Sequence, residues 1–201
     1  MPEAPSHDPS ELPHLRLERP SEGVALLTLD NPDQRNAMSD AMTASWSAAI
    51  GAGLCLALAC DIRYAAEGAK LGVPFNKLGM HAGMAGTWLL PDVVGPAHAR
   101  DLLLTGRVVE AQEALRLGLV SRVIDPGSFL DEVLETAAGI AATAPIAARL
   151  TKIALSDGGH ADFESALQWE ALAQPLTLAT ADLQEGIAAA KEKRAPRFEG
   201  R

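Results

Sequence analysis

Three small residues, Gly51-Ala52-Gly53, stand directly before an apolar run that extends from Leu54 to Cys60. The run is apolar on every side, so it must be buried all round, as a short helix or as a central strand. Where a helix begins, the first backbone N–H groups have no partner in the helix and can donate to an anionic oxygen. The N–H groups of Gly51-Ala52-Gly53 are therefore candidate donors to an anionic oxygen, and a tight entry into a buried helix is the structural alternative.

Other common patterns of catalytic and binding chemistry are absent from the sequence. Cys55 and Cys60 lie five residues apart and the five histidines are scattered, which does not suit a zinc site. The chain has no GxxxxGK[ST] motif, no GxGxxG after a strand and no GxSxG elbow. We therefore predict no metal site, no phosphate-binding loop and no serine nucleophile of that type.

The residues before this segment are expected to form a hairpin and a helix. Residues 15–18 and 24–29 are strand-like, and a turn containing Pro20 and Gly23 joins them. Ser39 is typical of an N-cap, and apolar residues at i, i+4 and i+8 predict a helix over residues 39–50. The glycines that follow are expected to end this helix.

The remainder changes from short extended segments to helices. Residues 62–65 and 70–74 are predicted to be extended, and residues 79–86 form a glycine-rich loop. Apolar spacing, Pro and Gly then predict one strand over 119–124 and a series of helices over 97–105, 111–117, 129–141, 146–155, 163–178 and 183–193.

The composition of the chain limits the kinds of partner that it can bind. The chain has 201 residues, 17 basic against 26 acidic, and a net charge of −9, so it offers no basic surface to nucleic acid or to anionic lipid. Residues 1–13 contain no apolar signal region, and we expect a disordered leader there. No segment approaches the roughly 20 apolar residues of a membrane span. Two cysteines favour a reduced compartment, so a cytoplasmic protein is predicted.

Four separate stretches carry a family resemblance. The central one runs from Gly51 through Asp61 to Ala65 and continues in LGVP (71–74), LG (78–79) and GMAGT (83–87). The others are NPDQRNAMS (31–39), LTGR (104–107) with AQEALRLGLVSRV (111–123), and KRAPRFEG (193–200). Together these stretches identify the chain as similar to the enoyl-CoA hydratase/isomerase family, also called crotonases.

The resemblance implies an α/β fold, a spiral of ββα units followed by a C-terminal helical region that assembles trimers, often paired into hexamers. On this basis residues 14–125 are the crotonase-like core and residues 126–201 the helical region. Several strands and helices that the family has between the positions of Ile50 and Gly51 are absent, so the N-terminal half is expected to be truncated. One of them supplies the second oxyanion donor, and losing such a donor lowers turnover about 10²–10³-fold.

The resemblance also implies a substrate and its contacts. The substrate would be an acyl-CoA thioester whose enolate oxygen accepts a hydrogen bond from the Ala52 N–H, with coenzyme A as part of the substrate and no separate cofactor. The residues that would contact the substrate are Gln34, Arg35, Ala37, Gly51, Gly53, Pro74, Phe75 and Lys193. For Arg35 and Lys193 the alternative is a solvated surface charge.

Proton transfer is where the sequence departs from the family. Hydratases of the family use two glutamates, and the corresponding positions here hold Cys55 and Phe75. A phenylalanine cannot transfer a proton, and a cysteine in an apolar run is typically an inert core residue. His81 is a candidate acid–base group, with a solvent-facing loop histidine as the alternative. The resemblance favours an enzyme of acyl-CoA lyase or isomerase type, and the rival is a non-catalytic remnant or oligomerisation module.

Overall fold

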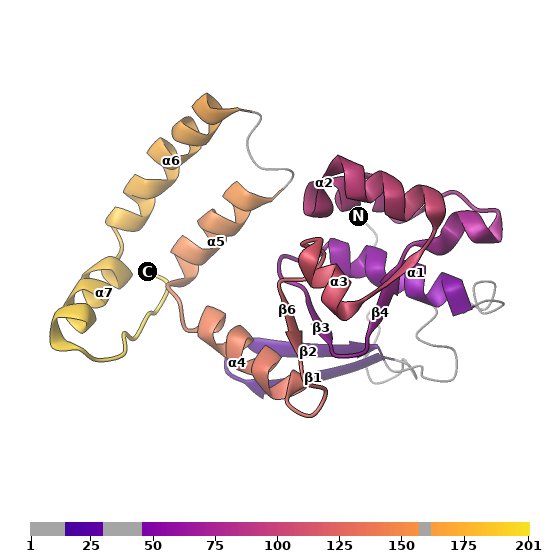
Figure 1. Ribbon diagram of the computed structural model, residues 1–201. Helices are drawn as coiled ribbons and strands as arrows, with labels where there is room; N and C mark the ends of the chain where they lie inside the picture. The colour runs from indigo at the N-terminus through magenta and orange to yellow at the C-terminus, as the bar shows by residue number, and fades with distance from the viewer. Residues whose placement is uncertain (1–14, 30–45, 157–161) are drawn as a thin grey trace, which may run out of the picture. The chain divides into compact units, whose positions relative to one another are not determined.

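The computed structural model describes residues 15–29, 46–156 and 162–201 (Figure 1). The chain divides into two compact units, with the main boundary between Val133 and Leu134. Five residues at the hairpin turn, Pro20–Val24, group with the second unit. This boundary lies eight residues beyond the division after residue 125 that the sequence suggested, so helix α4 (Phe129–Ala141) contributes to both units.

The predicted N-terminal hairpin forms, but its first strand is three residues longer than expected, so Pro20 lies in the strand and not in the turn. Strands β1 (Leu15–Ser21) and β2 (Val24–Leu29) make a two-stranded sheet. Gly23 at the turn has φ of +73°, a left-handed conformation that glycine adopts without a steric penalty.

Helix α1 (Trp46–Leu58) differs from the prediction. The expected break at Gly51–Gly53 is wrong, because α1 continues through these residues to Leu58. The predicted N-cap, Ser39, lies outside the described residues. A glycine inside a helix costs only about 1 kcal/mol relative to alanine, and burial of the apolar side chains that follow outweighs that penalty.

The first unit gathers its helices beside two small sheets (Figure 1). Strand β3 (Tyr64–Ala66) pairs parallel with β6 (Arg122–Ile124), and β4 (Lys70–Gly72) pairs antiparallel with β5 (Val108–Glu110). Helix α3 (Ala111–Arg116) follows β5 directly. Buried side chains of the first unit form one core cluster that includes Leu54, Leu58, Leu90, Leu102 and Leu119.

Helix α2 (Gly86–Thr105) is bent at Gly95, whose φ of 77° and ψ of 159° are not helical. The sequence predicts a helix only from residue 97, whereas α2 begins at Gly86 and is broken at Gly95, directly before Pro96, which supplies no N–H to the preceding turn. Gly106 ends α2 in the left-handed region, and its N–H donates to the Leu102 carbonyl at 3.0 Å.

The second unit consists mainly of helices α5 (Pro145–Leu155), α6 (Phe163–Leu178) and α7 (Ala181–Glu192). Helices α5 and α6 run antiparallel (Figure 1). Neither they nor α4 contains a buried residue, whereas α7 buries Asp182 and Ala189. Large apolar side chains are correspondingly exposed, as in Leu155 at 78% and Leu172 at 72%.

No single helix in the described part of the chain is long and apolar enough to cross a membrane. One pair bent by 109°, α4 with α5, meets the length and composition criteria only when the two helices are taken together.

Candidate functional site at the Gly51–Gly53 segment

Helix α1 places the three small residues of the candidate oxyanion segment in its interior. Gly51 and Ala52 are buried, with Ala52 only 1% exposed, whereas Gly53 is exposed. Ala52 is the seventh residue of α1. Only the first four N–H groups of a helix lack an intrahelical acceptor, so the α1 conformation engages the Ala52 N–H within the helix.

Phe75 packs its ring against the backbone of Gly51. A Cβ atom added to Gly51 would lie 3.0 Å from Phe75 Cζ, 3.1 Å from Cε2 and 3.3 Å from Cε1. Phe75 is 4% exposed and belongs to the 3₁₀ helix η4 (Pro74–Leu78), whose first residue, Pro74, is also buried. The structure thus brings together three of the predicted contact residues, Gly51, Pro74 and Phe75.

Replacing Gly53 with alanine is expected to raise the free energy of unfolding by about 1 kcal/mol, because the position is an exposed helix interior with nothing within 4 Å of the added Cβ. Gly51→Ala is the matched control, since its Cβ gains the same helix propensity but meets the Phe75 ring. It should therefore be less stable than Gly53→Ala. Urea denaturation measures both, and a destabilised Gly53→Ala variant would contradict the continuity of α1.

Cys55 lies one helical turn beyond Gly51 and is 1% exposed. Its thiol contacts the Gly83 carbonyl oxygen at 3.7 Å, and a Cβ added to Gly86 would lie 3.0 Å from Cys55 Sγ. Burial raises the pKa of the Cys55 thiol, which keeps it protonated and unreactive. These contacts agree with the interpretation of Cys55 as an inert core residue.

The other predicted residues lie outside this cluster. His81 is exposed in the segment between η4 and α2. Gln34, Arg35 and Ala37 lie outside the described residues. No group of three or more potential metal ligands occurs among the residues that the structure describes.

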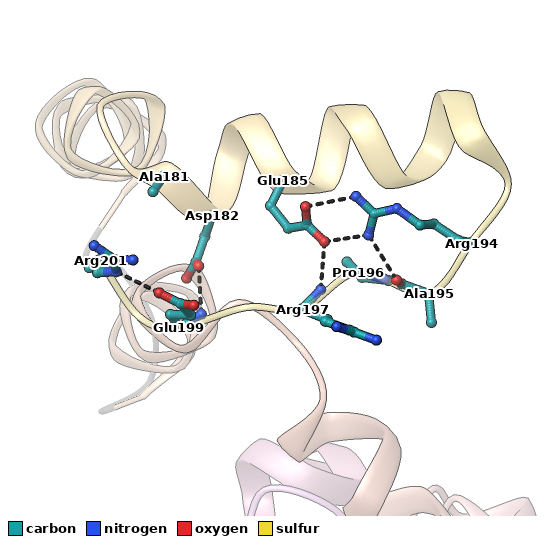
Figure 2. Close-up of a pocket in the computed structure, with 9 residues that line it drawn as sticks. All are labelled: Ala181, Asp182, Glu185, Arg194, Ala195, Pro196, Arg197, Glu199 and Arg201. Atoms are coloured by element: carbon teal, nitrogen blue, oxygen red, sulfur yellow. Dashed lines mark hydrogen bonds and ion pairs between the residues drawn. The ribbon is translucent and has the colours of Figure 1, made fainter.

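Lys193 is exposed and ends α7 in the left-handed region, with φ of 55°. Beside it, a cavity of about 780 Å³ lies between α7 and the C-terminal segment, and Lys193 does not line it (Figure 2). The residues that line it are Ala181, Asp182, Glu185, Arg194, Ala195, Pro196, Arg197, Glu199 and Arg201.

Most charges at this cavity are paired internally. Glu185 accepts hydrogen bonds from Arg194 Nη1 at 2.6 Å and Nη2 at 2.9 Å, and from the Arg197 N–H at 2.8 Å. These bonds lower the pKa of Glu185 to about 2, and the side-chain bond from Arg194 has the largest effect. The Arg197 side chain extends away from Glu185 (Figure 2).

Sequence reasoning missed the role of Asp182. Its buried carboxylate accepts the backbone N–H groups of Glu199 at 2.7 Å and Gly200 at 2.9 Å. The N–H groups of Ala181 and Asp182 in turn donate to the Arg201 carbonyl. An acidic residue in the first turn of a helix was visible in the sequence, but nothing there indicated that the C-terminal segment folds back onto it.

Comparison with known proteins shows which family this chain belongs to. Residues 46–201, which are 156 of the 201 residues, match the family described as enoyl-CoA hydratase/isomerase. The chain belongs to this family. The match confirms the family resemblance, and it begins four residues before the expected junction at Ile50 and Gly51. The resemblance noted over residues 31–39 lies outside the matched range.

Three relatives illustrate the enoyl-CoA hydratase/isomerase family. The chain is 43% identical over 150 residues to crotonyl-CoA hydratase of Syntrophomonas wolfei, 40% over 156 residues to mitochondrial methylglutaconyl-CoA hydratase of Rattus norvegicus, and 40% over 152 residues to (E)-benzylidenesuccinyl-CoA hydratase of Thauera aromatica. These matches cover 75%, 76% and 76% of this chain, but only 58%, 50% and 59% of the relatives' lengths.

Solved structures of the family support the same fold. The crystal structure of an enoyl-CoA hydratase from Bacillus anthracis superposes with a TM-score of 0.85 at 27% identity, covering 94% of this chain and 100% of that one. A second crystal structure, from Geobacillus kaustophilus, superposes with a TM-score of 0.71 at 36% identity, and the match covers 75% of this chain and 58% of that one. The chain therefore has the crotonase fold.

Proposed function

We propose that this chain binds an acyl-CoA thioester. The observation that carries the proposal is the shared part of the relatives' names. Crotonyl-CoA, methylglutaconyl-CoA and (E)-benzylidenesuccinyl-CoA differ in their acyl groups but are all thioesters of coenzyme A. A fold kept at 40–43% identity with these relatives supports the same substrate class here.

In the proposed complex the Ala52 N–H donates to the thioester oxygen and stabilises the enolate. This requires α1 to begin at Gly51, so that the Ala52 N–H falls among the unpaired donors of a first turn. Glycines on both sides of Ala52 make this part of α1 the easiest to unwind, since each weakens the helix by about 1 kcal/mol. Coenzyme A is part of the substrate, and no cofactor is proposed.

The remaining proposed contacts surround the thioester and the nucleotide. Gly51, Gly53, Pro74 and Phe75 would face the acyl end, and His81 is the proposed proton-transfer group. Gln34, Arg35 and Ala37 would contact the nucleotide, and the exposed ammonium of Lys193 would pair with its phosphates.

Butanoyl-CoA is expected to protect the chain against thermal unfolding. Binding to the folded state alone stabilises it by about 2.7 kcal/mol at a concentration 100 times the Kd. Lys193→Ala should weaken this protection, and Lys191→Ala, which removes a second exposed lysine two residues away, should leave it intact. Differential scanning fluorimetry measures the shift. A midpoint that no acyl-CoA or free coenzyme A moves would contradict the proposal.

The second candidate function is a non-catalytic oligomerisation module without a working pocket. Two observations favour it. The Ala52 N–H lies inside α1, and the two positions that correspond to hydratase glutamates hold buried, uncharged side chains. Under this alternative the chain assembles normally but no thioester protects it.

We also propose that the chain forms a homo-oligomer, a trimer or hexamer, through its C-terminal helices. Leu172 and Leu176 on α6 are 72% and 61% exposed, and apolar surface of this kind marks protein interfaces. Light scattering should give a multiple of 21.1 kDa. Charged substitutions at these leucines, Leu172→Glu with Leu176→Glu, should give the monomer mass, and Gln168→Glu on the same helix should not. A wild-type chain that runs as a monomer would refute this assembly.

We assign residues 14–125 to the thioester-binding core and residues 126–201 to the assembling region, and place the protein in the cytoplasm. Both described cysteines, Cys55 and Cys60, are free thiols, which supports a reducing compartment. The net charge of −9 argues against nucleic acid and membrane surfaces as partners.

A further inference from the structure

The ring of Phe75 fills the space immediately beside the Gly51 backbone. The three atoms nearest to a Cβ built on Gly51 are the outermost atoms of the ring, so the tip of the side chain points at α1. Phe75 belongs to the same buried cluster as Leu54, Cys55 and Leu90. The ring is therefore enclosed by apolar atoms and separates the candidate oxyanion segment from any further space in that direction.

The turn that carries Phe75 is held at several points. The Phe75 carbonyl accepts the Met80 N–H at 3.0 Å, and the Asn76 carbonyl accepts the Gly79 N–H at 3.1 Å. The Asn76 side-chain amide donates to the Leu104 carbonyl at 2.5 Å. With Pro74 fixing the start of η4, the backbone gives the ring little freedom to swing away from Gly51.

We propose that Phe75 limits the size of the acyl group that this chain accepts. The inference rests on the proposed function, in which the Ala52 N–H holds the thioester oxygen. The acyl group is attached to the same carbonyl carbon, so it extends from beside Gly51, and the Phe75 ring occupies space that a longer chain would need. Short acyl groups fit beside the ring, and longer chains are excluded until the side chain at position 75 is made smaller.

The test compares the wild type with Phe75→Leu and Phe75→Ala by calorimetric titration of free coenzyme A, butanoyl-CoA and octanoyl-CoA. Phe163→Ala is the matched control, because it removes the same ring from a position that is 78% exposed on α6. Phe75→Leu retains a branched apolar side chain and serves where Phe75→Ala does not fold. In parallel, benzene is added to each variant, since an apolar cavity of about 150 Å³ remains dry and binds benzene.

The Kd of octanoyl-CoA relative to butanoyl-CoA should fall at least tenfold in the Phe75 variants and stay unchanged in Phe163→Ala. A tenfold change corresponds to about two newly buried methylene groups. The same ratio in the wild type and the Phe75 variants would overturn the inference.

Failure of the proposed function has a different signature, in which no variant binds coenzyme A or any thioester. The proposal that Phe75 limits acyl-group size then fails as well, and the benzene titration shows whether Phe75 covers any space for a ligand. A benzene-dependent rise in the melting temperature of Phe75→Ala alone shows a real space that no thioester uses. No rise in any variant shows that the ring covers no ligand space at all.

Discussion

Crotonyl-CoA is expected to be hydrated by this chain at least about 10²–10⁴-fold more slowly than by its relative from Syntrophomonas wolfei. Adding water across a double bond needs one group that delivers a proton and one that removes a proton, and such general acid–base catalysis contributes a factor of this size. Phe75 has no exchangeable proton, and burial raises the pKa of the Cys55 thiol. Loss of the conjugated thioester absorbance measures both enzymes side by side. A rate within tenfold of the relative would contradict the prediction.

Any residual turnover provides the test of His81. This side chain is exposed between η4 and α2, so replacing it disturbs no buried contact. His81→Gln should abolish residual turnover if the imidazole transfers the proton, and His98→Gln, at an exposed position on α2, is the control. Equal rates in the two variants would remove His81 from the proposed mechanism.

Gly106→Ala is expected to destabilise the first unit by about 2–3 kcal/mol. Gly106 has φ of +58°, which costs a residue with a Cβ about 1–2 kcal/mol. A Cβ there would also overlap Asn76 Oδ1 and lie 3.3 Å from Pro74 Cα. The Asn76 amide would have to leave the Leu104 carbonyl, with the loss of about 1 kcal/mol more. Denaturation midpoints followed by circular dichroism report the change.

Gly68→Ala separates the two causes of this loss. Gly68 has φ of +77° but nothing within 4 Å of an added Cβ, so only the conformational penalty of about 1–2 kcal/mol applies. The double variant Gly106→Ala with Asn76→Ala should recover part of the stability that Gly106→Ala alone loses. If Gly106→Ala lowers the free energy of unfolding no more than Gly68→Ala does, η4 packs more loosely against the end of α2 than described.

The sequence predicted helix limits best where local capping sets them. Helix α6 spans Phe163–Leu178 as expected, because the Asp162 carboxylate caps it by accepting the Ser165 N–H at 2.8 Å. The break expected at Gly51 did not occur, because glycine is only a weak helix breaker and the flat Gly51 backbone packs under the Phe75 ring. Local propensity could not reveal a contact between residues so far apart in the chain.

The candidate site was predictable in composition but not in arrangement. The sequence indicated that uncharged side chains stand at positions 55 and 75, and the family resemblance gave Gly51, Pro74 and Phe75 as residues that would contact the substrate. It could not show that the Phe75 ring tip points at Gly51, or that Cys55 presses against Gly86. Those contacts depend on how η4 and α2 pack against α1, which no spacing rule determines.

The lack of buried side chains along α4, α5 and α6 affects how the stability of the second unit must be measured. A unit with so few interior contacts gains little free energy from its own packing. If other copies of the chain cover these helices, as proposed, the unfolding midpoint rises with protein concentration. Dilution would then melt α5 and α6 first, and their backbone amides would exchange with deuterium well before those of the first unit.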